Sequence, residues 1–155
     1  MYEEFMAEAI AEAKKAAGRG EVPVGAVIEK GGVIIGRGHN QTESSKDPTA
    51  HAEILAIREA AKALGGWRLL GCSLYVTCEP CAMCAGAMVL ARIDKVVIGA
   101  ADPKSGACGS VFNIVQEPRL NHFISIETGV MRQECEGMLK DFFRLRRKNT
   151  EGIRI

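Results

Sequence analysis

The first part of the chain changes from a helical to a strand-like pattern of apolar residues. In residues 1–18 apolar side chains return every three or four positions, so that one helical face carries Tyr2, Phe5, Met6, Ala9, Ile10 and Ala13. Gly18 is expected to end this helix. Residues 22–38 instead hold two β-branched runs that meet at Gly31 and Gly32, a pattern typical of a β-hairpin.

The middle of the chain predicts a strand, a helix and a strand in close succession. The strand covers residues 73–78, and Pro80 is expected to begin a helix that runs through residues 81–91. Residues 94–100 form the next predicted strand. Because the connections are short, the two strands are expected to pair in parallel through a right-handed crossover.

Three further elements complete the expected order. A helix is predicted from near His51 to the glycines at 65–66, and a short strand near residues 123–129. A last helix is predicted over roughly residues 132–148, with an apolar side made by Met138, Leu139, Phe142 and Phe143. The order α-β-β-α-β-α-β-β-α predicts an α/β fold, a three-layer α/β/α sandwich around one mixed five-stranded sheet.

Composition narrows the class of protein. The chain has 155 residues, 47% apolar and 25% charged, which is ordinary for one globular domain over residues 1–155. Its net charge of +1 excludes a polycation, so a nucleic-acid partner would need a local basic patch. The acidic N-terminus does not resemble a signal peptide, and no apolar run approaches the ~18 residues of a membrane span. We therefore expect a cytoplasmic protein whose six cysteines stay reduced, as metal ligands, nucleophiles or buried thiols.

The end of the chain is locally basic. Residues 140–155 have a net charge of +4, because Asp141 and Glu151 are outnumbered by Lys140, Arg144, Arg146, Arg147, Lys148 and Arg154. A cluster of basic residues is by itself only a weak indication of a binding surface. This segment is either the solvated end of a helix or a surface that binds an anionic partner.

Two short motifs offer a set of metal ligands. "TAHAE" places His51 and Glu53 at the expected start of one helix, and "EPCAMC" places Cys81 and Cys84 at the start of another. The i, i+3 spacing puts both sulfur atoms on one helical face, and the positive end of a helix favours thiolate over thiol. A catalytic zinc ion needs three protein ligands and one open position for water. The motifs therefore predict one Zn²⁺, held by His51, Cys81 and Cys84, with Glu53 as the acid–base group.

Two conditions decide whether such a site is open and catalytic. His51 and Glu53 would diverge on a regular helix, so His51 must lie at the cap for both to face the metal. Cys78 is a third cysteine at the same spacing, but it ends the preceding strand, and we expect it to pack beside the site. If Cys78 also bound the metal, the site would be closed, as in a structural zinc centre.

The combination of His-x-Glu with Pro-Cys-x-x-Cys is the signature of zinc nucleobase deaminases. At these residues the chain resembles the cytidine deaminase-like superfamily, and within it most closely the bacterial tRNA adenosine deaminases. The resemblance covers nearly the whole chain, including "EVPVGAVI", "DPTAHAEI", "EPCAMCAGAM", "VVIGAADPKSGACGS" and "DFFRLRRK". It implies hydrolytic conversion of adenosine to inosine at the wobble position of tRNA, and a homodimer.

The resemblance also implies roles for individual residues. His51, Cys81 and Cys84 would hold zinc, Glu53 would carry protons between water and the base, and Asn40 would hydrogen-bond the target nucleoside. The residues implied to lie near the anticodon loop of the tRNA are Asp102, Lys104, Ser105, Asn121, His122, Phe142, Arg144 and Arg147.

Structural interpretations of several of these residues stay open beside the functional ones. Asn40 and Asp102 are residues that also form turns, His122 is compatible with a purely structural role, and Phe142 fits the apolar side of the last helix.

Two other functions also remain open. A zinc deaminase of a free base or nucleoside, such as guanine or cytidine, would use the same chemistry. A cysteine at position 78 slightly favours it, because some purine deaminases share that residue. A non-catalytic zinc or iron–sulfur module would instead use Cys78, Cys81 and Cys84 together.

Overall fold

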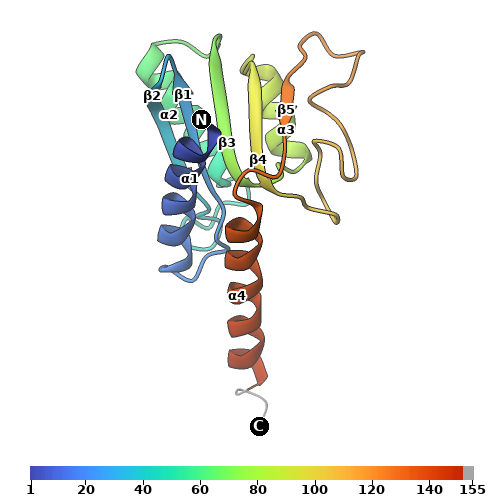
Figure 1. The fold of residues 1–155 in the computed structure, drawn as a ribbon. Helices are drawn as coiled ribbons and strands as arrows, with labels where there is room; N and C mark the ends of the chain where they lie inside the picture. The colour runs from blue at the N-terminus through green and yellow to red at the C-terminus, as the bar shows by residue number, and fades with distance from the viewer. Residues whose placement is uncertain (152–155) are drawn as a thin grey trace.

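The computed structural model describes residues 1–151, with side chains through residue 149 (Figure 1). Arg154, which contributes to the basic C-terminal segment, lies outside the described residues. The helices and strands, in chain order, are α1 (Tyr2–Ala17), β1 (Gly25–Lys30), β2 (Val33–His39), α2 (Ala52–Leu64), β3 (Cys72–Cys78), α3 (Ala82–Leu90), β4 (Lys95–Ala100), β5 (Ser125–Glu127) and α4 (Arg132–Glu151). This is the predicted order, element for element.

The five strands form one mixed sheet in the order β2-β1-β3-β4-β5. β1 pairs antiparallel with both β2 and β3, whereas β3, β4 and β5 pair in parallel. The parallel pairing of β3 with β4 across α3 confirms the predicted crossover. Strands β2, β3 and β4 therefore end at the same edge of the sheet, and the loops that follow them meet there (Figure 1).

Side chains alternate between the two faces of the sheet and so define two cores. Val27, Tyr75 and Val97 pack with α1 and with the first turns of α4. Their neighbours along the strands face the other way and pack against α2 and α3; these include Ile28, Leu74, Val76, Val96 and Ile98. Because one helical layer covers each face, the three-layer α/β/α sandwich is confirmed.

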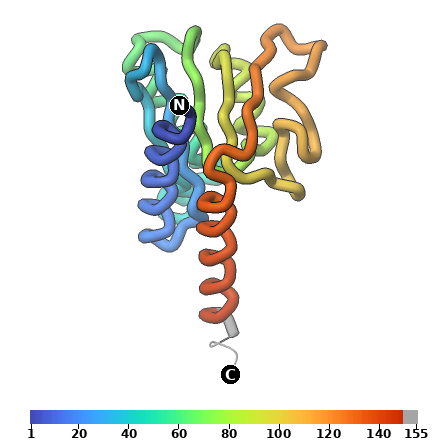
Figure 2. The backbone as a smooth tube through the Cα atoms, in the orientation of Figure 1, coloured from blue at the N-terminus to red at the C-terminus, as the bar shows by residue number. Residues whose placement is uncertain are grey.

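Helix α4 differs from its predicted packing. Its first turns contact the sheet through Cys135, Met138 and Leu139. Beyond them the helix extends past the body of the molecule, so its second half has no sheet to cover (Figures 1 and 2). Phe142 is half-buried, edge-on to Phe143, and Phe143 is 42% exposed. The expected apolar side of this helix is therefore buried only near its start.

The contact between α2 and β2 depends on the absence of side chains. A Cβ atom on Gly38 would lie 2.2 Å from the carbonyl oxygen of Ala52 and 2.8 Å from the amide nitrogen of Ala56. Gly36 makes the same kind of approach to Ala56 and Ala60 one turn further along α2. The two glycines let the backbone of the helix lie directly on the strand, which fixes where α2 begins.

We expect Gly38→Ala to destabilise the protein by about 1–3 kcal/mol, because the new methyl group must displace helix backbone. Gly137→Ala is a matched control, since nothing lies within 4 Å of a Cβ at that helical position. It should stabilise the protein by roughly 0.5–1 kcal/mol, as glycine does not favour helices. Urea unfolding with an unchanged m-value measures both, and equal effects would contradict the packing argument.

Candidate active site

A pocket of about 220 Å³ lies at the edge where β2, β3 and β4 end. It is walled by the segment before β1, the loop after β2, the start of α2, the turn before α3 and the loop after β4. The residues that line it are Val22, Val24, Asn40, Thr42, His51, Ala52, Glu53, Cys78, Glu79, Cys81, Asp102 and Ser105. The pocket is smaller than the roughly 300–1,000 Å³ typical of sites for drug-sized ligands.

His51 is the N-cap residue of α2, with extended backbone angles (φ −81°, ψ 153°). Helical geometry begins only at Ala52, so His51 and Glu53 are not held apart by a regular turn. Both side chains line the same pocket. The condition that His51 must occupy the cap is therefore confirmed.

Cys81 caps α3 in the same way, with φ −74° and ψ 176°, and Cys84 lies inside the first turn of that helix. Pro80 was expected to lie within the first helical turn, but it precedes the cap, and the helix begins at Ala82. Because the backbone at Cys81 is extended, the helix begins at Ala82, two residues later than expected. Cys81 and Cys84 still lie close together at its start.

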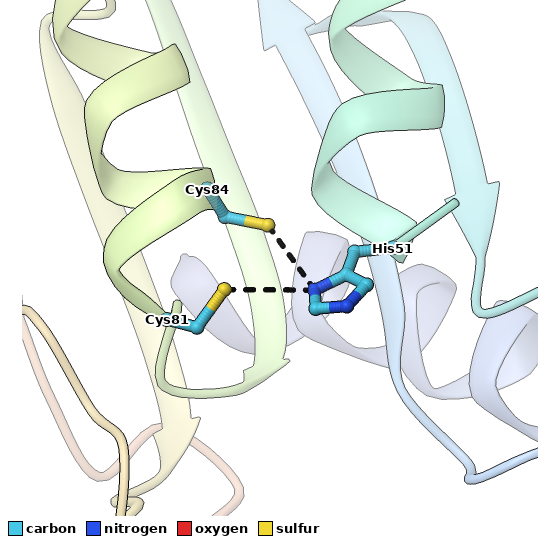
Figure 3. A group of neighbouring side chains, drawn as sticks. All are labelled: His51, Cys81 and Cys84. Atoms are coloured by element: carbon cyan, nitrogen blue, oxygen red, sulfur yellow. Dashed lines mark hydrogen bonds between the residues drawn. The ribbon is translucent and has the colours of Figure 1, made fainter. Parts of the chain in front are cut away.

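The starts of α2 and α3 bring three ligand atoms together (Figure 3). His51 Nδ1 lies 3.6 Å from Cys81 Sγ and 3.5 Å from Cys84 Sγ. In a tetrahedral zinc site with Zn–N of about 2.0–2.1 Å and Zn–S of about 2.3 Å, ligand nitrogen and sulfur atoms are about 3.6 Å apart. Imidazole with two thiolates also matches the softness of zinc. The residues present therefore fit a zinc ion.

The electrostatics of this cluster favour the ligand form of Cys81. Interactions with the Cys84 side chain and with His51 lower the pKa of Cys81 to about 4, which makes it a thiolate. Its negative charge and its contact with His51 raise the pKa of that histidine. Glu53 is 3% exposed, and burial raises its pKa to about 7.

Cys78 lines the pocket but does not belong to the three-residue cluster of possible metal ligands found among the described residues. Burial raises the pKa of Cys78 to about 12, so it remains a thiol. As expected, Cys78 is a packed neighbour at the end of β3. Three ligand atoms, rather than four, converge on one point.

Asn40 and Thr42 form the wall that follows β2. Asn40 donates its side-chain N–H to the carbonyl oxygen of Val22, at 3.4 Å, and accepts from the Thr42 N–H, at 3.3 Å. The loop beyond them is fastened by Glu21, which is 1% exposed and accepts hydrogen bonds from the N–H groups of Glu43 and Ser44. Asn40 therefore caps a turn and also faces the pocket.

The opposite wall is the loop after β4. Asp102 accepts from the N–H groups of Lys104, at 3.0 Å, and Ser105, at 3.2 Å, and from the Ser105 hydroxyl. Asp102 and Ser105 line the pocket, while Lys104 is exposed on the same loop. Asp102 is thus a turn former and a wall residue together.

Sequence reasoning missed several residues of the pocket. Val22, Val24 and Thr42 carry no chemical signal, because small apolar and hydroxyl residues occur throughout the chain. Glu79 is 6% exposed and accepts four hydrogen bonds from the wall that contains Asp102. Its position directly before Pro80 and Cys81 was the only signal for it in the sequence.

Cys84 and Lys104 adjoin the pocket without lining it, and five other sequence-predicted residues lie away from it. His122 donates a ring N–H to the carbonyl oxygen of Ile93, at 2.6 Å, which lies at the edge where β3 and β4 begin. The exposed Asn121 adjoins it, so both lie at the opposite end of the sheet from the pocket. The other three are on the second half of α4, beyond the pocket edge of the sheet (Figure 1): Phe142, Arg144 and Arg147.

Comparison with known proteins agrees with this fold and site. Residues 1–100 match the family described as the cytidine and deoxycytidylate deaminase zinc-binding region. The chain is 55% identical to a tRNA-specific adenosine deaminase of Bacillus subtilis (strain 168) over 150 residues, 97% of this chain and 93% of the relative.

Two solved structures are also similar. One comes from a study of A-to-I editing by tRNA:A34 deaminases at the wobble position of transfer RNA, with 45% identity and a TM-score of 0.85 over 88% of this chain and 99% of that one. The other is a guanine deaminase from Bacillus subtilis, with 39% identity and a TM-score of 0.62 over 79% and 82%. The matched zinc-binding region and the three-ligand cluster together support one zinc ion. The chain belongs to the cytidine and deoxycytidylate deaminase family and has its cytidine deaminase-like fold.

Proposed function

We propose that the protein is a zinc-dependent hydrolase that deaminates adenosine to inosine at the wobble position (34) of tRNA. The observation that carries this proposal is a cluster of three zinc ligands at a pocket that also holds a buried carboxylate, in a chain 55% identical to a tRNA-specific adenosine deaminase over almost its whole length. The overall reaction adds water to adenosine and releases inosine and ammonia.

His51, Cys81 and Cys84 are the residues that hold the zinc ion in this proposal. They supply three ligands, and the group of possible ligands within reach contains no fourth side chain among the described residues. When bound at such a three-ligand site, zinc acts as a Lewis acid that lowers the pKa of water to about 7. The cluster is thus catalytic rather than structural, since structural zinc sites are normally closed by four protein ligands.

Glu53 moves the protons. Its carboxylate is buried in the same pocket as the ligands but belongs to no ligand set, so it is free to act as a base. It accepts one proton from the attacking water and donates it to N1 of adenine. It then takes the second proton from the new hydroxyl group at C6 and gives it to the amino group there, which leaves as ammonia. One carboxylate can serve all of these transfers because N1 and the attacked C6 are adjacent ring atoms, within hydrogen-bond reach of a single group.

The walls of the pocket receive the base. Val22, Val24 and the thiol of Cys78 offer apolar surface, while the Asn40 amide and the loop around Ser105 offer polar groups. A base must leave its stack to reach such a pocket, which costs least in a single-stranded loop. We propose that Asn40, Asp102 and Ser105 contact the target nucleotide.

The anticodon stem-loop would extend from the pocket toward α4. That helix leaves the body at the pocket edge of the sheet (Figure 1), and its exposed second half carries Arg144 and Arg147 beside the half-buried Phe142. Arginine binds phosphate well, and an aromatic ring packs against bases. With Lys104 on the loop after β4, these residues form the proposed RNA-binding surface.

A homodimer would give Asn121 and His122 access to RNA. In one chain they lie at the far end of the sheet, so they can reach an anticodon loop only at the pocket of a second subunit. Exposed apolar side chains support such pairing: α3 exposes Met83 and Leu90, the latter 68% exposed, and Phe123 is 61% exposed. We propose a homodimer on this basis.

We propose a cytoplasmic location, where tRNA is available as substrate. Among the described residues no helix has the length and apolar character needed to cross a bilayer.

Deamination of a free base is the second candidate function. The likeness to a guanine deaminase and the thiol of Cys78 in the pocket favour it. The deciding experiment incubates the zinc-loaded protein with an anticodon stem-loop, with guanine and with cytidine. Inosine in the RNA supports the tRNA function, and ammonia from the small molecules alone supports the second. No product from any of the three would favour a non-catalytic metal-binding module.

Replacing a zinc ligand tests the metal site. We expect Cys81→Ala or Cys84→Ala to reduce bound zinc from one per chain to nearly none, because two ligands hold zinc poorly. Cys78→Ala is the matched control and should keep one zinc per chain. Metal analysis of the dialysed proteins gives the answer, and zinc lost from the Cys78 variant would show a closed site.

Replacing Glu53 tests the proton-transfer role. Glu53→Ala should lower kcat by at least the 10²–10⁴-fold typical of general acid–base catalysis, about the same as Glu53→Gln. Both variants should keep one zinc per chain, since Glu53 is not a ligand. Single-turnover deamination and metal analysis measure the two effects, and loss of zinc together with activity would contradict this role.

Replacing the arginines of α4 tests the RNA-binding surface. Arg144→Ala and Arg147→Ala should weaken stem-loop binding and reduce the slope of log K against log salt by about 0.7–0.9 for each lost phosphate contact. The kcat at saturating RNA should change little. Lys62→Ala is the control, because it removes an exposed cation of α2 beside β2, the edge strand farthest from β5 and Asn121. A slope unchanged in both α4 variants would exclude this helix from the RNA-binding surface.

A further inference from the structure

Glu79 is a buried carboxylate to which the proposed chemistry gives no role. It follows β3 directly and is 6% exposed. It lines the active-site pocket and also a second cavity of about 250 Å³. Glu79 belongs to none of the ion pairs, within 4.0 Å, of the described residues. A buried charge of this kind is retained only where hydrogen bonds satisfy it.

Those hydrogen bonds all come from residues 102–110, the loop after β4, which we call the wall loop. One carboxylate oxygen accepts from the Asp102 N–H, at 3.1 Å, and from the Ser110 hydroxyl. The other accepts from the N–H groups of Cys108, at 3.0 Å, and Ser110, at 3.1 Å. Glu79 therefore holds the wall loop at its beginning and at its end.

These contacts need an ionised carboxylate. Four donors point at two oxygen atoms, and an ionised carboxylate offers acceptors alone. An amide of the same shape would turn an N–H group toward at least one of these donors.

The packing of the wall loop against this carboxylate is close. A Cβ atom on Gly106 would lie 2.4 Å from the carboxyl carbon and from one oxygen of Glu79. The next residue, Ala107, donates its N–H to the carbonyl oxygen of Pro80, at 2.8 Å. The wall loop is thus fastened to the two residues that immediately precede Cys81.

We propose that Glu79 is a positioning residue for the deamination reaction. Its carboxylate holds the wall loop, and with it Asp102 and Ser105, at a fixed place relative to Cys81. The residue thereby sets where the pocket wall meets the substrate with respect to the metal ligands. The kinetic part of this proposal rests on the proposed function, while the structural part does not.

The test compares Glu79→Gln, Gly106→Ala and the double variant with Glu12→Gln. Glu12 is a control of equal burial, 4% exposed, whose carboxylate pairs with Lys15 and His39 instead of the wall loop. For each protein we would measure zinc content, kcat and KM on the anticodon stem-loop, and amide hydrogen exchange of the wall loop.

Each single variant should speed exchange at the Cys108 and Ser110 amides by about tenfold or more, since charge-assisted hydrogen bonds to them are lost. KM should rise by about tenfold, more than kcat falls, with zinc kept at one per chain. KM and wall-loop exchange in the double variant should be no higher than in the more affected single variant, because both substitutions disrupt the same contact between Glu79 and the wall loop. Glu12→Gln should leave KM and wall-loop exchange unchanged.

If the increases in KM of the two single variants multiply in the double variant, the positioning role is wrong. It is also wrong if zinc and kcat are lost together while KM stays constant. Unchanged hydrogen exchange in the wall loop of Glu79→Gln would also overturn the positioning role, whether or not the wild-type protein deaminates RNA. A wild-type protein that does not deaminate RNA would overturn the proposed function and leave the structural part of this proposal to the exchange measurement. If Glu79→Gln does not fold, Gly106→Ala probes the same contact from the loop side without removing a charge.

Discussion

The site depends on how closely two helices approach one edge of the sheet. Gly36 and Gly38 leave room for the backbone of α2 on β2, with the carbonyl oxygen of Ala52 in the space that a side chain would fill. On the other side, the short parallel crossover from β3 through α3 to β4 fixes where α3 begins. The N-cap residues His51 and Cys81 meet because of these two contacts.

Local features of the sequence predicted most of this arrangement. The order of elements followed from residue periodicity, and the ligand set followed from two motifs whose spacing fits helix starts. His51 and Cys81 each needed only a cap conformation to face one another. Such features depend on a few neighbouring residues, so a single amino-acid sequence is enough to predict them.

The rest depended on contacts between residues far apart in the chain. Phe143 fits an apolar stripe, yet whether the sheet extends far enough to cover it is not a local property. Asn121 precedes β5 by only a few residues, but its distance from the pocket follows from the direction of three parallel strands. Glu79 shows no motif of its own, because its partners come from a loop more than twenty residues later.

Two acidic residues organise the walls of the pocket from behind. Glu21 holds the loop after β2, and Glu79 holds the wall loop after β4, both through backbone N–H groups. Among the described residues no buried side-chain nitrogen or oxygen is left without a hydrogen-bond partner. Backbone N–H groups of both loops are likewise paired with these two carboxylates before substrate binds, which lowers the cost of irregular backbone beside the pocket.

The unsupported half of α4 has a mechanical consequence. The helix contains 20 residues, which at 1.5 Å per residue makes it about 30 Å long. In the part of the chain that the structure describes, its contacts with the core beside the sheet come from its first turns, through Cys135, Met138 and Leu139. The 12 residues beyond Leu139 are about 18 Å long, so a tilt of about 10° at that root would move the tip of the helix by roughly 3 Å. This is close to the ~3.4 Å of helix axis per phosphate along one strand of a DNA duplex. Small changes in packing at the root therefore shift the proposed RNA-binding surface relative to the pocket.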